Sequence, residues 1–170
     1  WGDTMPLAEP LAVGACTYLS RRGVPADVAG AARVRYSPSW GSANTFVGHA
    51  VVFPMQDEGG RLVAAEGRFM TPPAGVSKAH SAGTKSNGVF VALPGALEAQ
   101  GVTLCEGPIT ALSVAACGLP ALAICGHSRA PAWLVPHLAL QPVFLAFDYG
   151  EEGADTLARR LARELTALGA

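Results

Sequence analysis

The sequence predicts an α/β protein whose second half forms a parallel β-sheet with helices on both faces. Three observations support this fold class. From Gly88 onward, short apolar runs alternate with segments of helical spacing. Residues 121–125 and 143–147 are continuously apolar, as is typical of strands buried on both faces. Hydrophobic residues make up 50% of the chain and charged residues 15%, which is enough apolar material for a sizeable core.

The first half, residues 1–87, is predicted to form a smaller α+β subdomain. Residues 11–22 have helical spacing between Pro10, which suits a first helical turn, and Gly23, which suits a helix exit. A short helix is expected at 25–32. A Val- and Phe-rich strand at 46–54 and its partner strand at 61–70 flank a turn at 57–60 and predict a β-hairpin. The Pro-, Gly- and Ser-rich residues 71–88 are expected to form a long loop, and loops of that length are usually functional.

The second half, residues 88–170, contains the predicted parallel sheet. Strands are expected at 89–93, 102–105, 121–125 and 143–147, and helices at 94–100, 108–117, 131–138 and 152–168. The last helix has one apolar stripe, formed by Leu157, Leu161, Leu165 and Leu168. Such a stripe predicts that one face of this helix packs on the sheet.

Charge limits where a polyanion could bind. The net charge is −1, so any such site must be local. Between residues 59 and 97 one acid, Glu66, stands among four basic residues, Arg61, Arg68, Lys78 and Lys85. That stretch is either a basic patch or an ordinary solvated surface. Trp40, in a Ser-, Gly- and Asn-rich segment expected to be a loop, either packs on the core or stacks on a base.

The four cysteines, at positions 16, 105, 117 and 125, form no C-x-x-C pair and have no zinc-knuckle spacing to histidine. They are predicted to be reduced, buried thiols of a cytoplasmic protein. The apolar segment 110–126 is interrupted by Gly118 and Pro120, so it predicts a buried helix and strand rather than a membrane span.

Two acidic residues follow predicted parallel strands directly. Glu106 comes after residues 102–105, and Asp148 comes after residues 143–147. Ligands of parallel sheets bind at the carboxyl ends of the strands. If these strands are neighbours, the two carboxylates meet, and a hard cation such as Mg²⁺ or Mn²⁺ would relieve their repulsion. From spacing alone, a metal site and simple capping of the following helices are equally good interpretations.

Several motifs resemble those of known proteins. The segment EGPITAL at 106–112 resembles the first acidic motif of toprim domains, and FDYGEEG at 147–153 resembles the second, D-x-D-x-x-G. Upstream, TYLSRRGV at 17–24 resembles the Y-L-x-x-R-G-I segment of bacterial-type DNA primases. A hairpin of those primases is similar to VFPM at 52–55, followed by Gly-Arg at 60–61 and Glu-Gly-Arg at 66–68. From about Leu11 onward, the chain thus resembles a primase catalytic core, especially of the phage and plasmid branch.

The resemblance implies a fold and an activity. The fold would be a toprim parallel sheet with flanking helices at 88–170, preceded by a primase-like α+β subdomain with a β-hairpin at 1–87. The activity would be primer synthesis from nucleoside triphosphates on single-stranded DNA, with Mg²⁺ or Mn²⁺. The resemblance is also compatible with a replicative helicase as a partner. Binding to a membrane is not expected.

The same resemblance assigns roles to particular residues. Glu106 would be a metal ligand or general base, and Asp148 a metal ligand. Arg68, Lys78 and Lys85 would hold phosphates of template or nucleotide, through charge rather than base identity. Independently of the resemblance, the loop after residues 121–125 should open onto the same sheet edge as Glu106 and Asp148, so its His127 would either touch phosphate or make only local hydrogen bonds.

One departure from the toprim pattern affects the chemistry. Position 150, where the second Asp of D-x-D is expected, is Gly. Either Glu151 or Glu152 replaces the missing metal ligand, or both are ordinary acids of a first helical turn. The alternative to a working primase is therefore a catalytically degenerate toprim-fold module that binds nucleic acid within a replication or mobile-element protein. A toprim nuclease is a third hypothesis, against which the primase-like first half argues.

Overall fold

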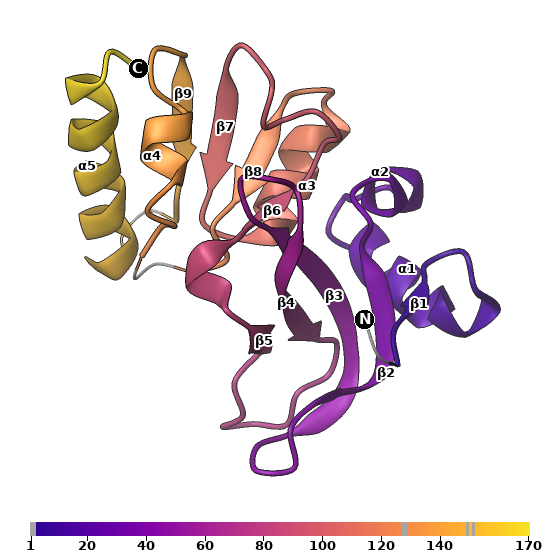
Figure 1. Cartoon of the computed structure of the whole chain (residues 1–170). Helices are drawn as coiled ribbons and strands as arrows, with labels where there is room; N and C mark the ends of the chain where they lie inside the picture. Colours follow the sequence, from indigo (N-terminus) through magenta and orange to yellow (C-terminus); the bar gives the residue numbers. More distant parts are fainter. Residues whose placement is uncertain (1–2, 127–128, 149, 151) are drawn as a thin grey trace.

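A mixed β-sheet runs through both halves of the chain (Figure 1). The structure is a computed structural model that describes residues 3–126, 129–148, 150 and 152–170. Within these residues the sheet has nine strands, and its main path is β1-β2-β3-β6-β8-β7-β9. Strands β4 and β5 extend from the other edge of β3. The strands are β1 (Met5–Pro6), β2 (Arg35–Gly41), β3 (Val47–Gln56), β4 (Leu62–Phe69), β5 (Ala79–Gly83), β6 (Val89–Val91), β7 (Val102–Cys105), β8 (Ala121–Ala123) and β9 (Val143–Ala146).

Helices flank this sheet in both halves. They are α1 (Val13–Ser20), α2 (Ala26–Ala31), α3 (Pro108–Ala116), α4 (Leu134–His137) and α5 (Glu152–Ala167), with two 3₁₀ turns, η1 (Pro10–Ala12) and η2 (Lys85–Asn87). The predicted helix at 11–22 is therefore divided between η1 and α1, and α4 is shorter than predicted. Leu157, Leu161 and Leu165 are buried as predicted, whereas Leu168 is 42% exposed because α5 ends before it.

The second half confirms the predicted α/β class. Strand β7 lies between β8 and β9 and is parallel to both. Helix α3 packs on one face, where Leu112 belongs to the same buried cluster as Cys105 and Ala123. Helices α4 and α5 cover the other face, where their leucines meet Leu104 and Leu122. The sheet is thus covered on both faces, which explains why its strands are apolar without alternation.

The prediction that this sheet is wholly parallel was wrong for its first strand. Strand β6 pairs with β8 in the antiparallel sense. The predicted helix at 94–100 is also wrong, since residues 94–100 form bends and turns, with Gly95 at φ +81°. The two errors have one cause: a parallel connection needs a crossover of a dozen or more residues, usually helical, and the link at 92–101 is too short.

Three strands of the first half, β1, β2 and β5, and the 3₁₀ turn η2 were not predicted. Strand β5 lies inside the predicted loop 71–88 and pairs with β4, and η2 follows it. Strand β2 contains Trp40, which the sequence had placed in a loop. The local sequences of β2 and β5 show no clear strand pattern. Their extended conformation comes from pairing with β3 and β4, respectively. The predicted hairpin itself is confirmed as β3 and β4.

Strand β3 connects the two halves. Its residues 47–52 pair with β2 and residues 55–56 pair with β6, while β4 occupies the opposite edge. Phe53 of β3 and Phe90 of β6, both fully buried, meet edge to face with ring centroids 5.4 Å apart. The hydrophobic core is therefore continuous from β3 into the parallel sheet. The division of the chain at residues 87 and 88 into two subdomains stays a prediction.

Trp40 packs across Gly67 of β4. Its indole Nε1 donates a 2.8 Å hydrogen bond to the carbonyl of His80 in β5. A Cβ added at Gly67 would lie 2.1 Å from that Nε1. Trp40 is therefore a packing residue of β4 and β5 in this structure, which favours the first of its two predicted roles.

We expect Gly67→Ala to destabilise the fold by about 1–3 kcal/mol, because the ring must move and its hydrogen bond must break. Thermal unfolding followed by circular dichroism measures the change. Gly30→Ala in α2 is the matched control, because a Cβ there meets no atom within 4 Å. The control should be neutral or slightly stabilising, since Ala favours a helix. Equal unfolding temperatures for wild type and Gly67→Ala would contradict the close packing.

Among the described residues, none of the helices has the length and apolar character that crossing a bilayer requires.

Candidate active site at the carboxyl end of the sheet

Glu106 and Asp148 leave neighbouring parallel strands at the same edge of the sheet. Cys105 of β7 is paired in register with Ala146 of β9. The backbone N–H of Glu106 donates to the carbonyl of Ala146 over 3.4 Å, which continues the ladder by one step. Glu106 is half-buried and Asp148 is exposed. The two strands are thus neighbours, which was the condition under which the sequence placed the two acids at one edge of the sheet.

The helix after β7 begins without a capping side chain. Gly107 is the N-cap residue of α3, and Pro108 occupies the first turn. A Pro there is tolerated because its missing N–H would have no helical partner. The N-cap position thus belongs to Gly107 and not to Glu106. Of the two interpretations that spacing left open for Glu106, this arrangement favours a role outside helix capping.

The segment after β8 lies against Glu106. The N–H of Ile124 donates to the carbonyl of Cys105 over 3.1 Å, and the N–H of Gly126 donates to the carbonyl of Glu106 over 3.2 Å. Cys125, between them, is buried with φ +55°, an uncommon conformation for a residue with a side chain. His127, the predicted phosphate contact, lies outside the described residues.

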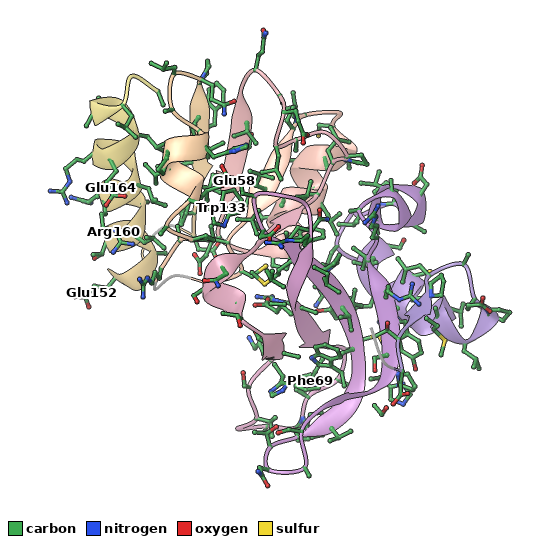
Figure 2. All side chains as sticks on the ribbon, viewed as in Figure 1. Glu58, Phe69, Trp133, Glu152, Arg160 and Glu164 are labelled. Carbon is green, nitrogen blue, oxygen red and sulfur yellow. The ribbon has the colours of Figure 1, made fainter. Side chains whose placement is uncertain are left out.

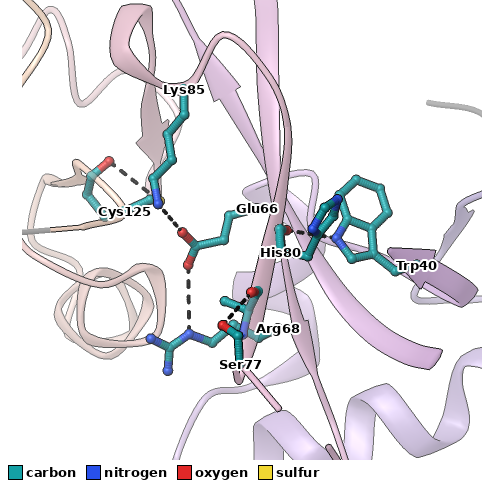
Figure 3. A network of polar contacts seen from close by, with 9 residues as sticks. Trp40, Glu66, Arg68, Ser77, His80, Lys85 and Cys125 are labelled. Carbon is teal, nitrogen blue, oxygen red and sulfur yellow. Dashed lines mark hydrogen bonds and ion pairs between the residues drawn. The ribbon is translucent and has the colours of Figure 1, made fainter. Parts of the chain in front are cut away.

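A buried ion cluster stands beside this edge. Glu66 of β4 is only 4% exposed, and its Oε2 lies 2.7 Å from Lys85 Nζ. Its Oε1 lies 3.8 Å from Arg68 Nε. Figure 3 shows the Glu66 carboxylate between the two cations, with Lys85 reaching toward Cys125. A carboxylate buried to this extent is costly unless cations compensate it, and here two do.

The predicted basic patch is therefore divided by the fold. Arg68 and Lys85 converge on Glu66, whereas Arg61 pairs with Asp57 over 2.7 Å in the β3–β4 turn. The hydrogen bond from Arg61 lowers the pKa of Asp57. Lys78 is exposed just before β5. Of the predicted phosphate-binding residues that the structure describes, Arg68 and Lys85 are brought together through Glu66, and Lys78 is not.

Glu66 belongs to the Glu-Gly-Arg segment at 66–68 that is similar to a primase hairpin, but the sequence did not predict it as a site residue. A signal was present, because Glu66 and Arg68 are two positions apart in a strand and such residues share one face. A lone acid on the same face as a basic residue predicts an ion pair. The second partner, Lys85, lies 19 positions away, and no local pattern indicates it.

The two cysteines near the site are not suited to bind metal or act as nucleophiles. Burial raises the pKa of the Cys105 thiol to about 12. Burial also raises the pKa of the Cys125 thiol well above its usual value, with the charge of Glu66 as a second cause. Since the thiolate is the ligand and nucleophile, both groups stay inert at neutral pH. The prediction that all four thiols are buried was wrong for Cys117, which is exposed at the end of α3, and only partly right for Cys16, which is half-buried.

The two carboxylates at this edge could bind a hard divalent cation that takes only a few of its ligands from the protein. Glu106 and Asp148 offer oxygen donors at adjacent strand ends, the donor type that Mg²⁺ and Mn²⁺ prefer. Across 3–126, 129–148, 150 and 152–170, three or more acidic, His or Cys side chains do not gather into a metal-binding group. Mg²⁺ commonly binds through one or two carboxylates together with substrate phosphates, so this set is compatible with it.

Of the two glutamates that could replace the missing acid, the structure describes Glu152 and not Glu151. Glu152 is exposed in the first turn of α5, and Figure 2 shows it at the outer end of that helix. Glu151 lies outside the described residues. Gly150 has φ +85°, a conformation that glycine adopts more readily than aspartate does. The backbone at position 150 is thus one that favours glycine.

Solved structures of primases share this architecture. The zinc-binding and RNA polymerase domains of the Aquifex aeolicus primase match 96% of this chain and 49% of that one, with 17% identity and a TM-score of 0.71. The RNA polymerase domain of Mycobacterium tuberculosis primase DnaG matches 96% of this chain and 67% of that one, with 16% identity and a TM-score of 0.69. This chain has the fold of a bacterial-type DNA primase core.

The same primase fold is found in a complex with nucleic acid. The DnaG primase catalytic domain bound to single-stranded DNA matches with 20% identity and a TM-score of 0.65, over 91% of this chain and 60% of that one. The chain thus spans about half to two thirds of these primase structures. No family model matches the sequence, and no curated protein matches it. The resemblance read from the motifs is confirmed at the level of the fold.

Proposed function

We propose that this chain is the core of a DNA primase-like nucleotidyltransferase that joins nucleotides on a single-stranded DNA template with Mg²⁺ or Mn²⁺. The observation that carries the proposal is the position of Glu106 and Asp148 at adjacent parallel strand ends, with the Lys85 ammonium group beside Gly126 of the neighbouring segment. The primase fold supports it, because related folds include one bound to single-stranded DNA.

The proposed chemistry assigns a task to each group. Glu106 and Asp148 would hold the divalent ion, which when bound would neutralise phosphate charge and favour attack by a hydroxyl. Lys85 and Arg68 would bind phosphate oxygens of the incoming triphosphate or of the template. Glu106 is half-buried and stands between the end of β7 and the start of α3, two elements that fix its backbone. Phosphoryl transfer depends mostly on such positioning and charge stabilisation.

A priming assay tests this proposal directly. The whole chain is incubated with labelled nucleoside triphosphates, single-stranded DNA of mixed sequence, and either Mg²⁺ or Mn²⁺. We expect labelled oligonucleotides that require both the template and the metal and that disappear with EDTA. Products that form without template, or no products with either metal on any template, would overturn the proposal.

Gly150 favours a second candidate, a module of the same fold that binds nucleic acid without catalysis. The missing aspartate removes one expected metal ligand, and Glu152 is exposed. Calorimetric titration with Mg²⁺ and Mn²⁺, together with fluorescence anisotropy on labelled single-stranded DNA, separates the two candidates. DNA binding without metal binding or synthesis would establish the second candidate. Metal-dependent degradation of the labelled DNA would instead indicate a nuclease.

A further inference from the structure

The buried Glu66 carboxylate connects the first half of the chain to the edge of the parallel sheet. Glu66 lies in β4, which is paired on one side with β3 and on the other with β5. Its backbone is therefore held on both edges, opposite Phe53 and Ser81. With its 2.7 Å contact to Lys85 Nζ, the side chain is fixed at both ends.

Lys85 is held at the strand ends by contacts on either side of it. The N–H of Thr84 donates to the carbonyl of Val63 in β4 over 3.0 Å. The carbonyl of Asn87 accepts a 2.9 Å hydrogen bond from Trp133 Nε1, just before α4. Lys85 Nζ would lie 3.4 Å from a Cβ placed on Gly126, the residue whose N–H bonds to the carbonyl of Glu106. The ammonium group is thus beside the backbone that borders Glu106.

We propose that Glu66 is a positioning residue that holds the Lys85 ammonium group at the carboxyl end of the sheet, ready to bind a triphosphate. This inference rests on the proposed function and names the group that orients its phosphate-binding lysine. Lysine has a flexible four-carbon stem, and ordering it when substrate binds costs conformational entropy. A buried carboxylate at 2.7 Å removes most of that cost before substrate arrives.

Stability alone does not explain this arrangement. A buried ion pair contributes little net stability, and apolar residues of similar volume often do as well or better. The lysine is also not withdrawn into the core, because its side chain is 36% exposed while that of Glu66 is 5% exposed. The pair therefore has a buried anchor and an accessible head, which suits a cation that must meet a ligand.

A double-mutant cycle tests the proposal. Glu66→Gln keeps the shape of the side chain and removes its charge, so Lys85 loses its fixed position. We expect kcat for primer synthesis to fall about tenfold. We expect affinity for single-stranded DNA to stay equal or to rise slightly, because the cluster of Glu66, Arg68 and Lys85 gains one net positive charge. In a Lys85→Met background, Glu66→Gln should change kcat less than twofold. The same cycle with Arg68→Met should leave the Glu66→Gln effect intact, because Arg68 is the more distant partner.

Two further variants separate positioning from a merely structural role. Glu58→Gln makes the same chemical change at an exposed turn residue and should leave kcat unchanged. Glu66→Asp retains the charge and should restore part of the lost rate. A structural role predicts instead that synthesis and DNA binding fall in the same proportion. The proposal is overturned by that result, or by equal losses from Glu66→Gln in the wild-type and Lys85→Met backgrounds.

Failure of the positioning role of Glu66 can be distinguished from failure of the proposed primase activity. A wild-type chain that makes no product under any condition removes the proposed function. The cycle is then measured by calorimetry with ATP and Mg²⁺ as the probe. Glu66→Gln must weaken ATP binding in the wild-type background and not in the Lys85→Met background. Equal ATP affinity of wild type and Glu66→Gln would remove the positioning role.

Discussion

Glu106→Gln and Asp148→Asn are each expected to lower the rate of the proposed metal-dependent primer synthesis by about a thousandfold. Each change replaces a charged oxygen donor by a neutral amide of the same size at an adjacent strand end. A bound divalent ion contributes several kcal/mol of charge stabilisation, and about 1.4 kcal/mol corresponds to a factor of ten in rate. The rate of labelled product formation at saturating triphosphate, with Mg²⁺ and with Mn²⁺, measures the loss.

The matched control for these variants is Glu164→Gln. Glu164 lies on α5, 48% exposed, in an i,i+4 pair with Arg160 (Figure 2). An exposed helical pair of this kind contributes a few tenths of a kcal/mol, so both rate and stability should be nearly unchanged. Circular dichroism of all variants verifies that they fold. Full activity of both Glu106→Gln and Asp148→Asn would show that the chemistry does not depend on these carboxylates.

Phe90→Ala is expected to lower the free energy of unfolding by about 3–5 kcal/mol. Phe90 is fully buried and packs edge to face on Phe53, where β3 meets β6. The substitution leaves a cavity between the two halves of the core and removes the aromatic contact. Urea denaturation followed by circular dichroism measures the change, and the midpoint should shift with little change in the slope.

Phe144→Ala is the control for that prediction, because it makes the same chemical change on a residue that is 68% exposed. Its effect should stay within about 0.5 kcal/mol, as is usual for surface substitutions. If Phe90→Ala lowered the free energy of unfolding as little as Phe144→Ala, the interface around β3 and β6 would not be part of the stable core. A loss confined to Phe90→Ala would agree with one continuous core.

Local sequence patterns were sufficient to predict the helices and strands that bury one face or both faces. The apolar runs at β7, β8 and β9, the leucine stripe of α5, and the proline at the start of α3 each predict their own structure. The acids at the ends of β7 and β9 follow from the same reasoning, because in a parallel sheet all carboxyl ends meet at one edge. The sheet edge at which Glu106 and Asp148 lie could therefore be predicted without coordinates, whereas the pairing of their two strands came from the structure.

Strand β5 and the direction of β6 could not be predicted in this way. The sequence Ala-His-Ser-Ala-Gly of β5 has weak strand propensity, and it becomes a strand because the edge of β4 offers hydrogen-bonding partners. Strand β6 looks like any other apolar run, and its antiparallel direction comes from the short link to β7 and from its pairing with β3 and β8. Pairing depends on partners that are distant in sequence.

The sequence by itself determined the α/β class, the strand ends that present Glu106 and Asp148, and the glycine that replaces an expected acid at position 150. Only the tertiary structure decided that Glu66 is buried and that it holds Lys85 beside Gly126. The physical reason is the range of the interactions. Periodicity and strand ends depend on neighbours along the chain, whereas burial of a charge and the choice of its partner depend on which strands the sheet brings together.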